Sequence, residues 1–166
     1  NMCYNATEPN LGLKLNMDRL TLKCYMGDTG LLISHAFDEN GGVPNEVYKN
    51  ILFDELDFNE GMIVENIVAQ MFVAAGKKLY FYASPTKVPL EDRMEIDFLI
   101  AKGTIDNRHN ISPVEVKSGK HYRTTSLDRF RKKYASELAQ AYVIHAKDYA
   151  EKDGIVYLPL YITGLL

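Results

Sequence analysis

Charged residues interrupt two short apolar segments in the middle of the chain. Glu115 and Lys117 lie in the segment 111–117, and Asp97 lies in the segment 95–100. Residues i and i+2 of an extended chain point to the same face and lie about 7 Å apart, so Glu115 and Lys117 are expected to share a face. If the two segments pair as strands, two carboxylates and one ammonium group meet at one place.

Buried carboxylates repel each other unless a cation, a proton or a lysine compensates their charge. Oxygen ligands favour Mg²⁺ or Mn²⁺, so Asp97 and Glu115 indicate a metal site. Zinc is not indicated, because none of the four histidines lies at zinc-ligand spacing to another His or Cys. His121 is the one histidine close in sequence to Lys117.

Glu65 lies in the segment 62–75, whose pattern predicts a helix that ends at Gly76. Its neighbours at helical spacing are apolar, and no Lys or Arg among them can pair with its carboxylate. We therefore expect a partner from another element. The alternative is that this edge of the helix simply faces water.

The remaining patterns predict an α/β fold with a mixed central sheet of four to five strands flanked by helices. The polar segment 102–110 is expected to be a hairpin-like connection that makes 95–100 and 111–117 neighbours. The expected strands are 20–26, 79–82, 95–100, 111–117 and 139–146, and 154–162 is a closing segment in which Pro159 marks an edge or an end. The expected helices are 31–37, 46–58 (one or two short helices), 62–75 and 125–138.

Composition indicates one compact domain. The chain has 166 residues and a formal net charge of −3, and we expect a single domain over residues 20–166. Residues 1–19 have no sustained period and are expected to be a loop, a weakly ordered arm or a remnant of a preceding domain. Cys3 and Cys24 form no CxxC pair, which predicts free thiols and a cytoplasmic location.

A basic segment follows Lys117. Its members are Lys120, Arg123, Arg129, Arg131, Lys132 and Lys133, and only Asp128 offsets them. A basic flank beside an acidic metal site suits nucleic acid, a polyanion that must approach carboxylates. The alternative is an ordinary amphipathic helix with a solvated basic face.

The triplet Asp28-Thr29-Gly30 resembles the catalytic turn of homodimeric aspartic proteases. Those enzymes are almost all β, whereas this chain has strong helical patterns. We prefer the interpretation that Asp28 or Thr29 caps the helix expected over 31–37.

The order of these motifs resembles the PD-(D/E)xK nuclease superfamily, and within it the C-terminal domain of a prokaryotic AAA-type ATPase family. The segments that carry the resemblance are KCYMGDTGLL (23–32), VENIVA (64–69), EIDFL (95–99), PVEVKSG (113–119) and GIVYLPL (154–160). The resemblance implies a restriction-endonuclease-like core. One departure is that Glu95-Ile96 stands where the superfamily has a proline before the first acid.

The resemblance also implies roles for single residues. Asp97 and Glu115 would bind Mg²⁺ or Mn²⁺, Glu65 would hold the metal or its water from the helix, and Lys117 would orient or deprotonate the attacking water. The implied reaction is hydrolysis of phosphodiester bonds in DNA. An N-terminal ATPase domain of the same protein, absent from this chain, is the implied partner. The alternative is a catalytically silent accessory domain that binds nucleic acid or a protein partner for the ATPase.

Overall fold

The computed structural model describes residues 1–10, 12–37, 45–46, 49, 60–85, 87–101, 110–119 and 121–166. The strands in this part of the chain are β1 (Met2–Ala6), β2 (Met17–Cys24), β3 (Leu79–Ala83), β4 (Glu95–Ile96), β5 (Phe98–Ala101), β6 (Ile111–Lys117), β7 (Ala141–His145), β8 (Ala150–Lys152) and β9 (Ile155–Pro159). The helices are α1 (Thr29–Phe37), α3 (Glu60–Ala74) and α4 (Thr125–Lys133), with the short 3-10 helices η1 (Leu90–Asp92) and η2 (Leu160–Leu165).

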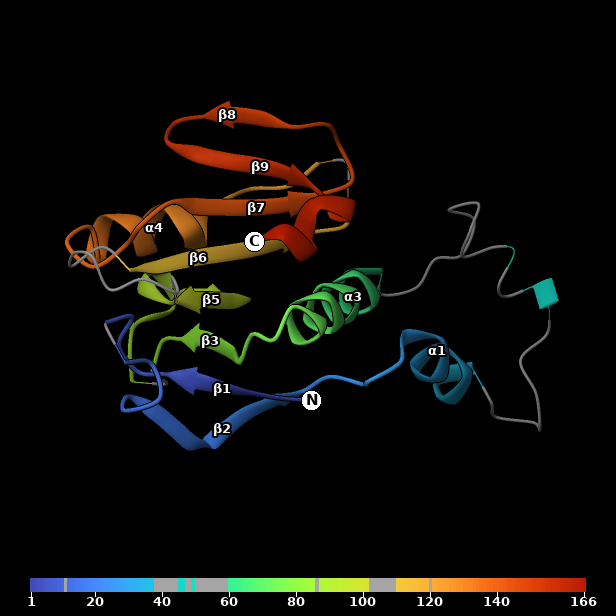
Figure 1. Ribbon diagram of the computed structural model, residues 1–166. Helices are drawn as coiled ribbons and strands as arrows, with labels where there is room; N and C mark the ends of the chain where they lie inside the picture. Colours follow the sequence, from blue (N-terminus) through green and yellow to red (C-terminus); the bar gives the residue numbers. More distant parts are fainter. Residues whose placement is uncertain are drawn as a thin grey trace.

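The strands form two mixed sheets instead of the single central sheet that the sequence predicts. The order in the first is β2-β1-β3-β4, and the order in the second is β5-β6-β7-β9-β8. The first contains the parallel pair β1–β3, and the second contains the parallel pairs β6–β7 and β7–β9. The mixed α/β class is therefore confirmed. In Figure 1 the strands of the second sheet continue from those of the first, because β5 lies next to β3.

The sheets meet at Asp97, where the expected strand 95–100 is divided. Ile96 pairs with Tyr82 of the first sheet, and Phe98 pairs with Val114 of the second. The simple alternation expected for this strand is broken here, because Ile96 and Leu99 both enter the same core cluster. The chain thus changes sheet at the residue that the sequence marks as a metal ligand.

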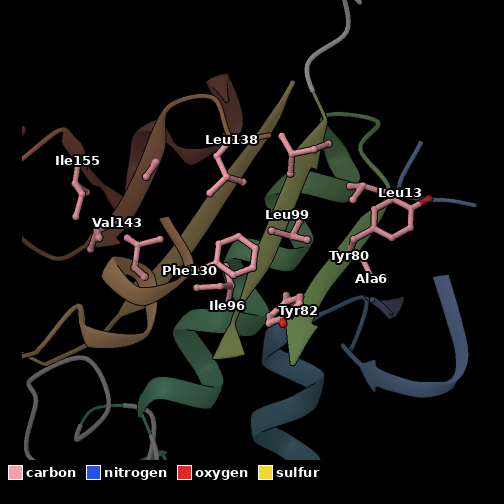
Figure 2. Close-up of a cluster of buried hydrophobic side chains, with 13 residues drawn as sticks. Ala6, Leu13, Tyr80, Tyr82, Ile96, Leu99, Phe130, Leu138, Val143 and Ile155 are labelled. Atoms are coloured by element: carbon pink, nitrogen blue, oxygen red, sulfur yellow. The ribbon is translucent and has the colours of Figure 1, made fainter. Parts of the chain in front are cut away.

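Two hydrophobic clusters fill the two faces of these sheets, as period-2 strands require. In β3, Tyr80 and Tyr82 enter the cluster under α4, whereas Phe81 enters the cluster under α3. Figure 2 shows the first cluster, where Phe130 of α4 packs near Ile96 and Tyr82. Figure 1 shows α3 and α4 on opposite faces, so each face has its own helix.

Several expected elements are wrong in detail. The loop or weakly ordered arm expected over residues 1–19 is wrong for Met2–Ala6, because these residues form β1 between β2 and β3. The helix expected to reach residue 138 ends at Lys133. The closing segment 154–162 divides into β9 and η2, and β8 has no counterpart among the expected strands. The division of the chain into residues 1–19 and 20–166 stays a prediction.

Asp28 caps α1, as expected. Its Oδ1 accepts a hydrogen bond from the Leu31 N–H at 2.8 Å, which satisfies a helix donor that has no partner within the helix. The DTG triplet is therefore the start of a helix. Most of the segment 46–58 and of the connection 102–110 lies outside the described residues.

Across the part of the chain that the structure describes, the helices are too short or too polar for any of them to cross a membrane.

The β8–β9 turn generates a stability prediction. Asp153 and Gly154 both have positive φ (52° and 71°), the conformation of a tight hairpin turn. G154A places a side chain in left-handed backbone, and its Cβ would lie 2.7 Å from Arg131 Nη2. We expect a loss of about 1–2 kcal/mol in the free energy of unfolding, measured by urea titration. The matched control is G27A, where no described atom lies within 4 Å of the added Cβ, and its stability should be unchanged or slightly raised.

Candidate functional site

Three of the four predicted catalytic residues line one cavity of about 540 Å³, which we call the acidic cavity. Glu65 reaches it from α3, Asp97 from the β4–β5 junction and Lys117 from the carboxyl end of β6. The fourth, Glu115, is not among the described lining residues. The lining consists of Lys23, Cys24, Tyr25, Leu32, Gly61, Met62, Glu65, Asn66, Asp97, Val116 and Lys117.

Glu65 has a partner from another element, as its apolar helical neighbours predict. Lys23 of β2 lies 3.1 Å from Glu65 Oε1, and the Tyr25 hydroxyl donates a hydrogen bond to the same oxygen. Lys23 also pairs with Glu95 at 2.6 Å. Burial alone would lower the pKa of Lys23, but the Glu95 hydrogen bond and the charge of Glu65 raise it overall. Lys23 therefore stays an ammonium group between two acids.

Asp97 is the acid whose ionisation changes most. Its Oδ2 accepts a hydrogen bond from the Val116 N–H at 2.8 Å, which ties the β4–β5 junction to β6. Burial, and next the negative charge of Glu65, raise the pKa of Asp97 from an ordinary 3.8 to about 7. The Val116 hydrogen bond and the charge of Lys23 only partly oppose this. A cation in the cavity would relieve the repulsion between Asp97 and Glu65.

Glu115 and Lys117 share a face, as their spacing predicts, and they form an ion pair of 2.7 Å through Glu115 Oε1. Glu115 is only 5 % exposed, and its Oε2 has no hydrogen-bond partner among the described residues. Burial raises the pKa of Glu115, although Lys117 opposes the shift. The structure therefore brings Glu115 to Lys117, and through Lys117 to the edge of the acidic cavity.

The donor set fits a metal only in part. Among the described residues, no three His, Cys, Asp or Glu side chains are grouped so that they could hold an ion. The expected set of Asp97, Glu115 and Glu65 is thus not assembled. Asp97 and Glu65 alone do line one cavity. Two carboxylates fit Mg²⁺, which commonly keeps several waters and takes one or two carboxylates from the protein.

The predicted nucleic-acid-binding residues lie elsewhere. Arg123 precedes α4, Arg129, Lys132 and Lys133 lie on it, and none of these four residues lines the acidic cavity. Lys133 Nζ instead lies over the Tyr134 ring, 4.9 Å from its centroid. Lys120 lies outside the described residues.

Sequence reasoning missed Lys23, Tyr25 and Asn66. Asn66 is only 2 % exposed, and its Oδ1 accepts a hydrogen bond from the Met26 N–H at 2.8 Å, which holds the end of β2 against α3. The sequence gives no signal for Lys23, because residues 20–26 alternate Leu20 and Leu22 against Lys23, which predicts that Lys23 faces water. The structure has the opposite orientation, since Leu20 and Leu22 are exposed and Lys23 is half-buried.

A family model described as a domain of unknown function (DUF4143) matches residues 60–163. This range includes α3, the β4–β5 junction and β6, and it leaves out β1, β2 and therefore Lys23. No curated protein and no solved structure matches the chain.

The raised pKa of Asp97 generates a pH-dependent prediction. The folded protein holds this proton more tightly than the unfolded chain does, so the free energy of unfolding falls as the pH rises from about 4 to about 7. D97N removes the charge and keeps an acceptor for the Val116 N–H. We expect the variant to be more stable than the parent by up to a few kcal/mol at pH about 8, and to lose that advantage near pH 4.

Urea unfolding in EDTA measures this difference, and D92N, an exposed carboxylate in η1, is the matched control. D92N should differ from the parent by the same small amount at both pH values. If D97N were equally destabilised at both, the repulsion between Asp97 and Glu65 would have no energetic consequence.

Proposed function

Because the chain belongs to the family described as the domain of unknown function DUF4143, we propose its function from the chemistry of the acidic cavity: Mg²⁺- or Mn²⁺-dependent hydrolysis of phosphodiester bonds in DNA. The domain would be a PD-(D/E)xK-type nuclease domain, and its N-terminal partner would be an AAA-type ATPase domain. The order of the motifs between residues 23 and 160 supports both parts of the proposal.

One observation carries the proposal. Glu65, Asp97 and Lys117 are far apart in the sequence, yet all three line a single cavity. Two carboxylates can hold a divalent ion that activates water, and an amine can offset the charge of a phosphate. The raised pKa of Asp97 adds to this, because perturbed carboxyl groups in a cleft are concentrated at functional sites.

Asp97 and Glu65 would hold the divalent ion, which when bound lowers the pKa of a coordinated water and stabilises charge on the phosphoryl oxygens. Lys117 would orient the attacking water and offset the negative charge of the phosphate. Glu115 would be a positioning residue, because its contact is the Lys117 ammonium group at 2.7 Å. Lys23 would fix the Glu65 carboxylate through their ion pair.

A silent docking domain is the second candidate. The observation that favours it is that the acids already have cationic partners, since Lys23 pairs with Glu65 and Lys117 pairs with Glu115. In that case the lysines, and not a metal ion, neutralise the acids, and the domain binds nucleic acid or a protein without hydrolysing DNA.

Calorimetric titration with Mn²⁺ or Mg²⁺ and a plasmid-nicking assay separate the two candidates. We expect the parent chain to bind one ion and to nick plasmid DNA. D97A should abolish both properties, because the ion loses a ligand. K117A should keep ion binding and lower the nicking rate by about 100-fold or more, because Lys117 acts on water and phosphate.

The matched control is D92N, an exposed carboxylate outside the acidic cavity, which should behave as the parent in both assays. Ion binding that D97A and E65Q leave intact would remove the proposed site. Nicking that survives in D97A and K117A would assign the activity to a contaminant. An absence of both binding and nicking in the parent chain would favour the docking domain.

A further inference from the structure

Lys23 is shared between one acid that lines the acidic cavity and one acid that does not. Its Nζ lies 3.1 Å from Glu65 Oε1 and 2.6 Å from Glu95 Oε1. Glu65 lines the cavity, whereas Glu95 is not among the described lining residues, and the Glu95 side chain is 55 % exposed. The Lys23 ammonium group therefore stands at the border of the cavity, with one acidic partner on each side.

The Lys23 side chain reaches across the first sheet to make these contacts. Lys23 belongs to β2 and Glu95 to β4, which are the two edge strands in the order β2-β1-β3-β4. Between them, Lys23 Nζ lies over the ring of Phe81 in β3, 5.2 Å from its centroid. Glu95 and Phe81 can thus hold the ammonium group without any contribution from Glu65.

Lys23 occupies the charge position that the proposed function gives to a divalent ion. Burial raises the pKa of Asp97 and the charge of Lys23 opposes that rise, so Lys23 acts on both acids of the proposed ion site. An ammonium group and a divalent ion on one carboxylate repel each other strongly in a half-buried place. Glu65 therefore cannot bind the ion while it keeps its full ion pair with Lys23.

Glu95 lets Lys23 leave Glu65 without becoming an unpaired charge. An ammonium group without a counter-ion is unfavourable in a half-buried place, but Lys23 keeps the shorter of its two ion pairs. The lysine stem is flexible, so a rotation of its last bonds can carry Nζ away from Glu65. The Glu65 carboxylate stays oriented, because the Tyr25 hydroxyl donates a hydrogen bond to the same oxygen.

We propose that Lys23 competes with the divalent ion for Glu65, and that Glu95 holds Lys23 once it has been displaced. The Lys23–Glu65 ion pair then orients the carboxylate before the ion binds, and Lys23 sets the ion concentration at which the acidic cavity fills. The inference rests on the ion site of the proposed function, but it requires neither DNA nor hydrolysis.

Calorimetric titration with Mn²⁺ in the absence of DNA tests this competition. K23M removes the ammonium group and keeps an apolar stem of similar length, so Mn²⁺ should bind about tenfold more tightly than to the parent. E95Q removes the acid that holds the displaced Lys23, so Mn²⁺ should bind about fivefold more weakly. The matched control is K78M, which removes an exposed lysine at a different cavity and should leave the affinity unchanged.

The double variant K23M/E95Q separates displacement of Lys23 from a general effect of charge. If Glu95 acts by holding Lys23, E95Q should have little effect on Mn²⁺ affinity once Lys23 is absent. Equal weakening by E95Q with and without Lys23 would overturn the proposal, because Glu95 would then act only through its negative charge. Unchanged Mn²⁺ affinity in K23M would overturn it as well.

Thermal unfolding gives a second readout of the same competition. K23M should have a lower Tm than the parent in EDTA, because Glu65 loses its counter-ion, and Mn²⁺ should raise the Tm of K23M by more than that of the parent. An equal rise in both proteins would count against the competition. K23Q, which keeps a neutral donor for both acids, takes the place of K23M if K23M does not fold, with the same expected directions.

The inference and the proposed hydrolysis can fail separately. Mn²⁺ binding that K23M strengthens, in a protein that does not nick DNA, would support the inference and count against hydrolysis. Nicking by a parent chain whose Mn²⁺ affinity does not depend on Lys23 would do the reverse. An absence of Mn²⁺ binding in both the parent and K23M would overturn the inference together with the proposed ion site.

Discussion

The hydrogen bond from the Val116 N–H to Asp97 Oδ2 holds the rest of the site together. At Asp97 the chain leaves the first sheet and enters the second, so the β5–β6 ladder loses its next backbone acceptor. A buried N–H without an acceptor is costly, and the carboxylate supplies the missing acceptor. The same hydrogen bond places a carboxyl group at the junction of the two sheets, in the cavity that Glu65 of α3 also lines.

The Asp97 carboxylate affects the free energy of unfolding. Burial and the charge of Glu65 both disfavour its ionisation, and the lysine that opposes them is Lys23, from the distant strand β2. Replacing buried ion pairs by packed apolar side chains often stabilises a protein. Apolar residues would serve a core at this junction better, so the two acids and two lysines found there are the observation that motivates the proposed function.

The local part of this arrangement can be predicted from the sequence, and the long-range part cannot. Short apolar runs bounded by turn residues identify β3 and β6, the polar connection 102–110 predicts that β5 and β6 are neighbours, and helical spacing shows that Glu65 needs a partner. The Asp153-Gly154 pair is a usable signal for the β8–β9 hairpin. β1 gives no such signal, because a polar residue, Asn5, occupies one of its buried positions. Asn5 is tolerated there because its Oδ1 accepts a hydrogen bond from the Ala83 N–H at 2.9 Å, a partner that is 78 residues away in the chain. The change of sheet at Asp97 likewise depends on pairings with two separate strands, which no local pattern contains.

The acidic cavity presents a difficulty of charge for the proposed function. An acidic cavity repels a phosphate group, and the net charge of −3 gives no general attraction for a polyanion. The basic helix α4 does not resolve this, since its cations do not line the acidic cavity. Within the acidic cavity, Lys23 and Lys117 supply positive charge, and in the proposed function a divalent ion held by Asp97 and Glu65 would add to it.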